Sequence, residues 1–264
     1  MKRIVAWLFL AASAAFASST TITIVPAGAG PGAIPTAVGD RNAWILSTFG
    51  SGWNPQTLES FESFGFGPYN SLSTGVGTFS VMPGSQPGDY WQSNGTKTDQ
   101  FTILNSSDTP FSGRFNTTPG GNNWLDSNDI TQIQLTTSLS TLFFFITDVN
   151  DIGGTLTIRT ADGASSANFA PNAADGNLYF VGIHSSGSIG SVQWLNNSNN
   201  DGWGLDDFGT AVDPPPPPHI YTPAVPEPSS WPIAAAALIA IPVIRKYRAR
   251  AGQAKLERLS ETSA

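Results

Sequence analysis

The chain has 264 residues, a formal net charge of −7, 12% charged residues and no cysteine. The lack of cysteine excludes a disulfide framework, a cysteine-ligated zinc site and a thiol nucleophile. Glycine (27) and proline (20) are abundant, and charged residues are about half as frequent as the roughly 25% of average soluble domains, which favours an exported β protein over a helical bundle or a nucleotide-binding α/β enzyme.

Charge is distributed unevenly along the chain. The stretch from Ser18 to Val225 holds four basic and sixteen acidic residues, a net charge of −12, and eight of the twelve basic residues lie at the two ends. An acidic central region repels the phosphate backbone of nucleic acids. The sequence therefore predicts no nucleic-acid partner, and it places basic residues where membrane-targeting segments are expected.

The N-terminus has the three parts of a secretory signal peptide. Two basic residues follow the initiating methionine, residues 4–16 form an apolar run, and Ala15 and Ala17 supply the small residues of an A-x-A cleavage site. We expect cleavage after Ala17, which removes residues 1–17 on export.

Residues 18–212 are predicted to form one ectodomain of many short strands. Apolar and polar residues alternate in short segments that Gly-, Pro- and Asn-rich turns separate, and no convincing helical period occurs outside the two ends of the chain. The fold class that this pattern predicts is all-β, an antiparallel jelly-roll-like β-sandwich. The predicted strands are 21–24, 44–49, 57–66, 77–82, 100–104, 130–136, 140–147, 155–160, 178–184, 189–195 and 205–212.

One of these strands is apolar on both of its faces. The run Leu142–Ile146 has no polar residue, which predicts a central strand covered on both sides. Phe180, Trp194 and Phe208 are predicted to supply core side chains from other strands. Residues 18–212 are thus expected to bury a single core between two sheets.

A loop before the last predicted strand is a candidate calcium site. Asn197, Asn199 and Asp201 place oxygen-bearing side chains at alternate positions and a glycine follows, as in the first half of an EF-hand-type loop. The twelfth position is Phe208 instead of glutamate. The alternative interpretation is a metal-free Asn/Gly turn.

Three further carboxylates could complete that calcium site. Asp206 and Asp207 lie nearby, although neighbours on a regular strand point to opposite faces, so only one is expected to join. Glu62 could contribute if the first and last strands pair. The similar run Asp148–Gly153 has Ile152 where an oxygen is needed, so it is interpreted as a hairpin turn, and 126–129 as a polar loop.

The sequence offers no identifiable catalytic site. Glu59 and Glu62 are spaced so that they fall on opposite faces of a strand, which excludes them as a glycosidase pair. No G-x-S-x-G motif accompanies His184, which is interpreted as a strand-end residue. We therefore predict that the protein is not an enzyme; the alternative is a secreted carbohydrate-active enzyme of the glycoside hydrolase type with an Asp-based site.

Several tryptophans are candidates for stacking on sugar rings. They lie in or beside polar, Gly-rich segments, which suggests partial exposure; the alternative is that they are ordinary core residues. They are Trp44, Trp53, Trp91, Trp124 and Trp203. Repulsion is expected between the acidic middle and an acidic polysaccharide unless calcium bridges the two.

The C-terminal region has three parts. Residues 213–224 form a proline-rich linker, and nine of the twenty prolines lie between 214 and 232, which favours an extended polyproline II spacer. The apolar run 229–244 is predicted to be one transmembrane helix, although it is shorter than the roughly 20 residues that span a bilayer. A basic cluster follows as a stop-transfer signal: Arg245, Lys246, Arg248 and Arg250.

This order of parts resembles the PEP-CTERM sorting signal of bacterial exported proteins. The resemblance covers 225–250 and includes the motif Val225, Pro226, Glu227 and Pro228. It implies recognition by an exosortase-type membrane protease that cuts near the motif, in bacteria that make exopolysaccharide. The apolar run is short and a 14-residue tail (251–264), predicted to be cytoplasmic, follows. The alternative is a C-terminal anchor that is never cut.

The central segments also resemble the ectodomains of PEP-CTERM proteins. The resemblance is carried by residues 144–154, 178–180 and 200–207, and it implies a carbohydrate-binding-like sandwich without implying an activity. The sequence therefore predicts an exported protein that is membrane-anchored and, after processing, reaches the cell surface or extracellular matrix. The expected role is structural, adhesive or glycan-binding, with extracellular polysaccharide as a partner and Ca²⁺ as the one candidate cofactor.

Overall fold

The computed structural model describes residues 19–89, 97–106, 113–160 and 165–213, all of which belong to one compact unit, Met1–Pro214. The predicted signal peptide and sorting signal, with its apolar helix and tail, lie outside the described residues, as does the linker from residue 214 onward. Within the described ranges, no helix is long and apolar enough to cross a membrane.

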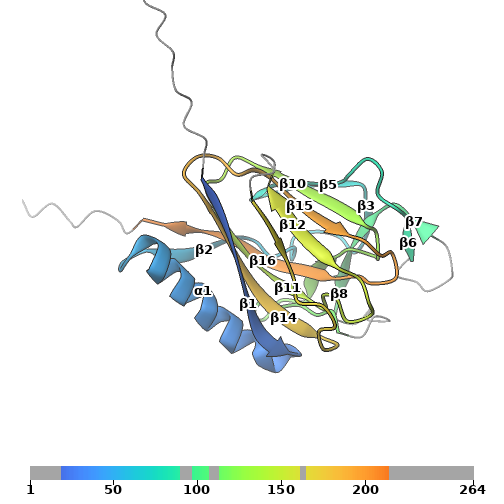
Figure 1. Cartoon of the computed structure of the whole chain (residues 1–264), viewed down its shortest axis with the longest axis horizontal. Helices are drawn as coiled ribbons and strands as arrows, with labels where there is room; N and C mark the ends of the chain where they lie inside the picture. The colour runs from blue at the N-terminus through green and yellow to red at the C-terminus, as the bar shows by residue number, and fades with distance from the viewer. Residues whose placement is uncertain (1–18, 90–96, 107–112, 161–164, 214–264) are drawn as a thin grey trace, which may run out of the picture. The chain divides into compact units, whose positions relative to one another are not determined.

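The larger of two main sheets has eight strands, all paired antiparallel (Figure 1). The last strand, β16, lies in its middle and also pairs with β2. In spatial order the strands are β1 (Thr20–Ala29), β14 (Asn177–Ser185), β11 (Thr141–Thr147), β16 (Gly204–Val212), β9 (Asn123–Asp126), β8 (Phe101–Asn105) and β3 (Gly67–Tyr69), with β2 (Asn54–Glu59) beside β16.

The second sheet has six strands and is also antiparallel. A separate two-stranded ladder joins β6 (Gly88–Asp89) to β7 (Lys97–Thr98). The six strands are, in order, β13 (Ser166–Asn168), β12 (Leu156–Thr160), β15 (Gly190–Asn196), β10 (Gln132–Thr137), β5 (Gly77–Val81) and β4 (Ser71–Thr74).

An aromatic core joins the two main sheets. Phe144 of β11 stacks on Phe208 of β16 with ring centroids 4.7 Å apart, and it meets Trp194 of the six-stranded sheet edge-on at 5.4 Å. All three side chains are fully buried. Aromatic pairs in these geometries stabilise by about 0.5–1.5 kcal/mol beyond the area they bury. The prediction of an all-β antiparallel fold is confirmed, and so is the core role of Trp194 and Phe208. Phe180 is buried as well, but in a second apolar cluster outside the sandwich, so the expected single core was wrong.

Residues 44–49, predicted to be a strand, instead end a helix. The single-turn helix η1 (Pro31–Ala33) leads into α1 (Ile34–Phe49), with Pro35 in the first turn, where its missing N–H costs nothing. Only Ala37, Trp44 and Ile45 of α1 are buried, so the apolar face is too narrow to give a clear helical period. That narrow face explains why the sequence pattern was misread.

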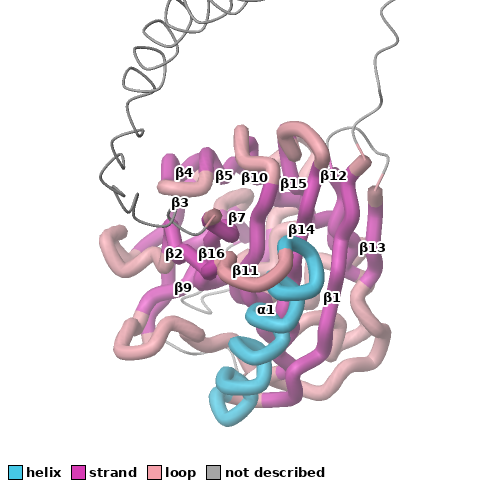
Figure 2. The backbone as a smooth tube through the Cα atoms, turned by 90° about the vertical axis from the view of Figure 1, so that its left-hand side faces the viewer, coloured by secondary structure: helices cyan, strands magenta, loops and turns pink. Residues whose placement is uncertain are grey.

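Helix α1 covers the outer face of the eight-stranded sheet over β1, β14 and β11 (Figure 2). Phe143 and Phe145 point to this outer cluster, whereas Phe144 and Ile146 point into the sandwich core. The prediction that this strand is covered on both sides is therefore confirmed, and the second cover is a helix.

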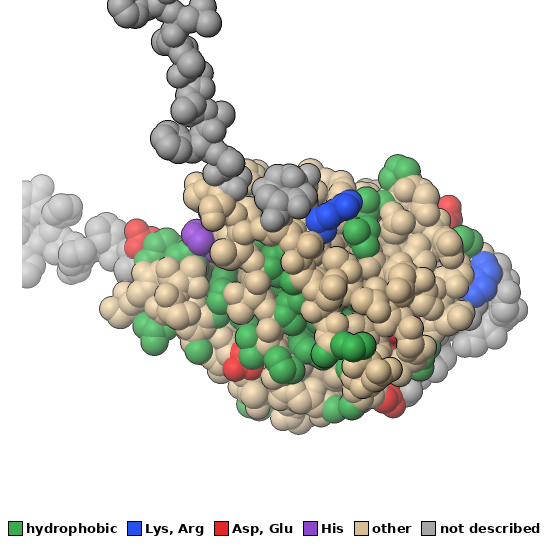
Figure 3. Space-filling view, viewed as in Figure 1, with side chains coloured by type: hydrophobic (Ala, Val, Ile, Leu, Met, Phe, Trp, Pro, Cys, Tyr) green, Lys and Arg blue, Asp and Glu red, His purple; other side chains and the backbone are tan. Residues whose placement is uncertain are grey.

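The outer face of the six-stranded sheet is polar. One row of cross-strand neighbours runs through every strand, and its members are Ser71, Ser80, Gln134, Gln193, Arg159 and Ser166. Gln193 accepts from the Arg159 guanidinium and donates to Gln134, the latter at 3.0 Å. Figure 3 likewise shows few charged side chains on the face of the molecule that it draws.

Candidate functional site

The predicted calcium loop uses its amide side chains to hold neighbouring loops. The Asn197 Oδ1 accepts the Thr155 N–H at 2.8 Å, and the Asn199 Nδ2 donates to the Pro87 carbonyl at 3.2 Å. Asp201 is buried, and its carboxyl interacts with other carboxylates described below. The described contacts of these three side chains therefore lead to three different parts of the fold.

Asp206 and Asp207 do not point to opposite faces, which corrects the expectation for a regular strand. A β-bulge inserts one extra residue in β16 between the partners of Phe143 and Phe145, and Asp207 has a positive φ of 53°. Both carboxylates consequently reach Thr118, whose Oγ1 donates to Asp207 at 2.7 Å and to Asp206 at 3.3 Å.

Asp206 binds a short stretch of backbone tightly. Its Oδ2 accepts the Thr117 N–H at 2.7 Å and the Thr118 N–H at 3.1 Å. Burial, and then the charge of Asp207, raises the pKa of Asp206 well above its usual range. Burial raises the pKa of Asp207 as well, with the nearby Glu62 charge adding to it. The carboxylates of this network anchor the segment at 117–118 to β16.

Glu62 shapes a polar loop. Its Oε1 accepts three hydrogen bonds, from the backbone N–H groups of Asn122 and Asn123 at 2.8 and 2.9 Å and from the Asn116 Nδ2 at 3.1 Å. The pairing of β2 with β16 brings Glu62 toward Asp207. The structure thus gathers Glu62, Asp206 and Asp207 in one network and leaves the three residues of the 197–201 loop outside it.

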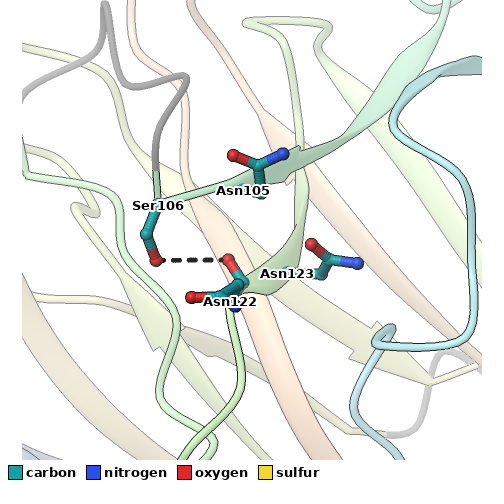
Figure 4. Close-up of a pocket in the computed structure, with 4 residues that line it drawn as sticks. All are labelled: Asn105, Ser106, Asn122 and Asn123. Atoms are coloured by element: carbon teal, nitrogen blue, oxygen red, sulfur yellow. Dashed lines mark hydrogen bonds between the residues drawn. The ribbon is translucent and has the colours of Figure 1, made fainter.

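An amide-lined cavity lies directly beside this loop, at the paired ends of β8 and β9. Its volume is about 470 Å³, and its described lining is Asn105, Ser106, Asn122 and Asn123 (Figure 4). Asn105 and Asn123 are cross-strand partners, and the Ser106 hydroxyl donates to the Asn122 carbonyl at 3.3 Å. Binding sites for small ligands commonly have volumes of about 300–1,000 Å³. None of these four side chains is charged.

Of the candidate tryptophans that the structure describes, none is exposed as a sugar platform would be. Trp44, Trp124 and Trp203 are buried, and Trp53 is half-buried with its ring stacked on Phe49 at 4.7 Å. Trp91 lies outside the described residues. For the three buried residues, the expectation of partial exposure was wrong, because the β-sandwich and the loops around it enclose side chains that look exposed from their polar neighbours alone.

A second polar centre surrounds the buried Arg114. Its Nη1 lies 3.1 Å from Asp126, its Nη2 2.9 Å from Asp129 and its Nε 3.4 Å from Asp148. Burial alone would lower the pKa of Arg114, but these three carboxylates raise it above its usual value. The polar loop predicted at 126–129 is therefore half of a buried ion-pair network.

Three more carboxylates adjoin that network. Asp148, Asp151 and Asp175 bring oxygens within 4.8 Å of one another, and Asp201 lies against Asp151. Burial raises the pKa of Asp148 to about 6. Burial, and then the adjoining Asp151 carboxyl, raises the pKa of Asp201 to about 7. The sequence reading missed this set because its members come from three separate connections between strands.

Comparisons with known proteins give structural matches only. No protein-family model matches the chain, and no curated protein matches it. One similar solved structure is the N-terminal CBM22-1–CBM22-2 tandem domain of Paenibacillus barcinonensis Xyn10C, with 14% identity and a TM-score of 0.28 over 63% of this chain. The match spans about half (47%) of that tandem-domain chain.

A second similar structure is the carbohydrate-binding module CBM6cm-2 of Cellvibrio mixtus lichenase 5A, solved in complex with cellotriose. It matches with 14% identity and a TM-score of 0.21, over 58% of this chain and 94% of that one.

Proposed function

We propose that this chain is an exported bacterial cell-surface or extracellular-matrix protein whose jelly-roll-like β-sandwich binds a neutral glycan. The signal peptide, the PEP-CTERM-like segment and the basic cluster behind it support export and sorting by an exosortase-type protease. The amide-lined cavity at Asn105, Ser106, Asn122 and Asn123 supports the glycan-binding part.

The cavity carries this proposal because its chemistry matches sugar hydroxyls. An asparagine amide offers two donors and an acceptor, and a serine hydroxyl offers both functions. A hydroxyl-rich ligand can exchange hydrogen bonds with such a lining without leaving a charge unpaired. Glu62 fixes the two backbone N–H groups of Asn122 and Asn123, so the lining is organised before a ligand arrives, which reduces the entropy cost of binding.

Glycan binding can be tested by substituting Asn122, whose side chain makes none of the described hydrogen bonds. Asn122 bonds Ser106 and Glu62 through its backbone alone, so Asn122→Ala should leave the fold intact and weaken binding to a glycan array about tenfold. Asn200→Ala, the same change at an exposed asparagine that does not line the cavity, is the matched control. Absence of array binding by the unmodified chain would favour a purely structural matrix role.

Sorting is a separate part of the proposal and has its own test. Mass spectrometry of the mature protein from the producing cell should find an N-terminus after Ala17 and a C-terminus near Pro226–Pro228. A C-terminus still at Ala264 would contradict processing and leave an uncut anchor as the explanation of the apolar run.

A glycoside hydrolase remains the competing function, and the Asp cluster is the place it would use. Asp148, Asp151 and Asp175 bring oxygens within 4.8 Å of one another, which is compatible with the carboxyl separation of about 5–5.5 Å in retaining glycosidases. Turnover therefore has to be measured to separate the two functions. We expect no turnover on a panel of oligosaccharides, and hydrolysis that Asp151→Asn abolishes would contradict that expectation.

A further inference from the structure

We propose that Asp148, Asp151, Asp175 and Asp201 form a Ca²⁺ site, which shares only Asp201 with the loop that the sequence suggested. The four side chains come from three connections that meet at one place: β11–β12 supplies Asp148 and Asp151, β13–β14 supplies Asp175, and β15–β16 supplies Asp201. This inference goes beyond the glycan-binding proposal and does not depend on it.

The spacing of the oxygens fits a calcium ion. Ca²⁺ takes six to eight oxygen ligands at 2.3–2.6 Å, so two of its ligands can be up to about 5 Å apart. One oxygen from each of Asp148, Asp151 and Asp175 lies within 4.8 Å of the others. Asp148 is buried, Asp151 is half-buried and Asp175 is exposed, so water can supply the remaining ligands from the open side.

Asp201 is the independent observation that points to a ligand here. Its side chain is 2% exposed, and no hydrogen-bond donor among the described residues reaches either of its oxygens. The polar group beside it is the Asp151 carboxyl, and the Arg114 charge offsets only part of the resulting repulsion. A buried carboxylate beside another carboxylate is costly, and a cation between the two removes that cost.

The local charge favours a cation. The ion pairs of this region within the described residues all belong to Arg114, which contacts Asp126, Asp129 and Asp148. Asp151, Asp175 and Asp201 therefore add three acidic groups that no ion pair in the described structure offsets. A divalent ion supplies the charge that a single guanidinium leaves uncompensated.

The loops that carry these ligands are held in place by buried amides. Asn150 Oδ1 accepts the Leu156 N–H at 2.7 Å, and its Nδ2 donates to the Phe169 carbonyl at 3.2 Å. Asn177 bonds both the N–H and the carbonyl of Val149. Carboxylates on loops fixed in this way need little rearrangement to bind an ion. Ca²⁺ accepts irregular arrangements of oxygen ligands, whereas Mg²⁺ demands a near-ideal octahedron, so this carboxylate set suits Ca²⁺ better.

The test is calorimetric titration of the full chain with CaCl₂ and with MgCl₂, after chelator treatment and without glycan. Extracellular calcium sites bind with Kd of about 10⁻⁴–10⁻³ M. At 10 mM CaCl₂ we expect one bound ion per chain and a rise in Tm of about 5–10 °C. Asp151→Asn and Asp175→Asn should each weaken calcium binding about tenfold or more, while Asp99→Asn, an exposed aspartate elsewhere, should not.

Two results would overturn the proposal: no heat and no change in Tm at 10 mM CaCl₂, or equal calcium affinity in the unmodified chain and both variants. If Asp151→Asn does not fold, as judged by circular dichroism, the calcium affinity of Asp175→Asn decides, because Asp175 is exposed. Because the readout contains no glycan, failure of this site and failure of glycan binding are distinguishable.

Discussion

Trp44 of α1 lies directly against the backbone of Gly182 in β14. A Cβ built on Gly182 would overlap the indole ring, and Trp44 also packs against Phe180 of the same strand, with ring centroids 5.7 Å apart. Because residue 182 has no side chain, α1 can pack closely against the sheet.

We therefore expect Gly182→Ala to destabilise the protein. The added methyl group must displace a buried indole, and such overpacking costs about 1–3 kcal/mol. Gly39→Ala is the matched control, because Gly39 lies in α1 and nothing within 4 Å of its Cβ position opposes the change. It should stabilise by about 0.5–1 kcal/mol through helix propensity. Urea denaturation of the two variants should move the midpoint in opposite directions.

Within the buried network, substitution of Arg114 should lower the free energy of unfolding most. Arg114→Ala leaves Asp126, Asp129 and Asp148 without their guanidinium, and removing one partner of a buried ion pair costs about 3–5 kcal/mol. Arg114→Lys should recover only part of that loss, because an ammonium group cannot reproduce the planar fork that meets Asp126 and Asp129. Equal stability of the lysine variant and the unmodified protein in urea would contradict this account.

Asp206 predicts a pH dependence of stability. Its pKa in the folded protein is raised, so folding favours the protonated carboxyl. The stabilisation from this group is complete below the ordinary carboxyl pKa of about 4 and is lost as pH rises through the raised value. With chelator present, the free energy of unfolding should fall as the pH rises above the ordinary carboxyl pKa of about 4. Asp206→Asn, which cannot ionise, should make that fall smaller; an unchanged slope would assign the dependence to other carboxyls.

Glu62 should control the shape of the cavity through hydrogen bonds. Glu62→Ala removes the acceptor of three hydrogen bonds, and we expect lower stability, by about 1–3 kcal/mol, together with weaker glycan binding. Glu62→Gln keeps an acceptor oxygen and should restore most of both. Thermal melting and glycan-array binding of the two variants check this prediction. Normal glycan binding by the alanine variant would show that the Glu62 hydrogen bonds do not control the cavity.

Strand positions were predictable from the sequence where one face of the strand is buried. Nine of the eleven predicted strands match observed ones well, because period-two alternation records which side chains face the core. The strand predicted at 57–66 meets β2 only over 57–59 and was wrong beyond it, where the chain turns. The strand prediction at 44–49 was wrong because few side chains of α1 reach the sheet. The contact of α1 with Gly182 joins residues far apart in the sequence, so no local pattern reveals it. Short edge strands such as β3 and β13 bury too little to leave a pattern.

The candidate sites were predictable only in part. Sequence reasoning singled out Asp201 and Glu62, and both lie in polar centres, but these centres are different. Local spacing linked Asp201 to Asn197 and Asn199, whereas the fold links it to Asp151 from another connection. The bulge that turns Asp206 and Asp207 to the same threonine breaks the alternation rule on which the expectation was based.

The polar row across the six-stranded sheet affects how copies of the protein pack against one another. Helix α1 hides apolar side chains of the other sheet, so the broad face that one copy presents here to its neighbours is made of serine, glutamine and arginine. Gln193 donates to Gln134 and accepts from Arg159, and Gln134 donates to Thr136, so a neighbouring copy would gain little by displacing the hydration of this row. Molecules packed densely at a surface or in a polymer would therefore remain separated by water along this face.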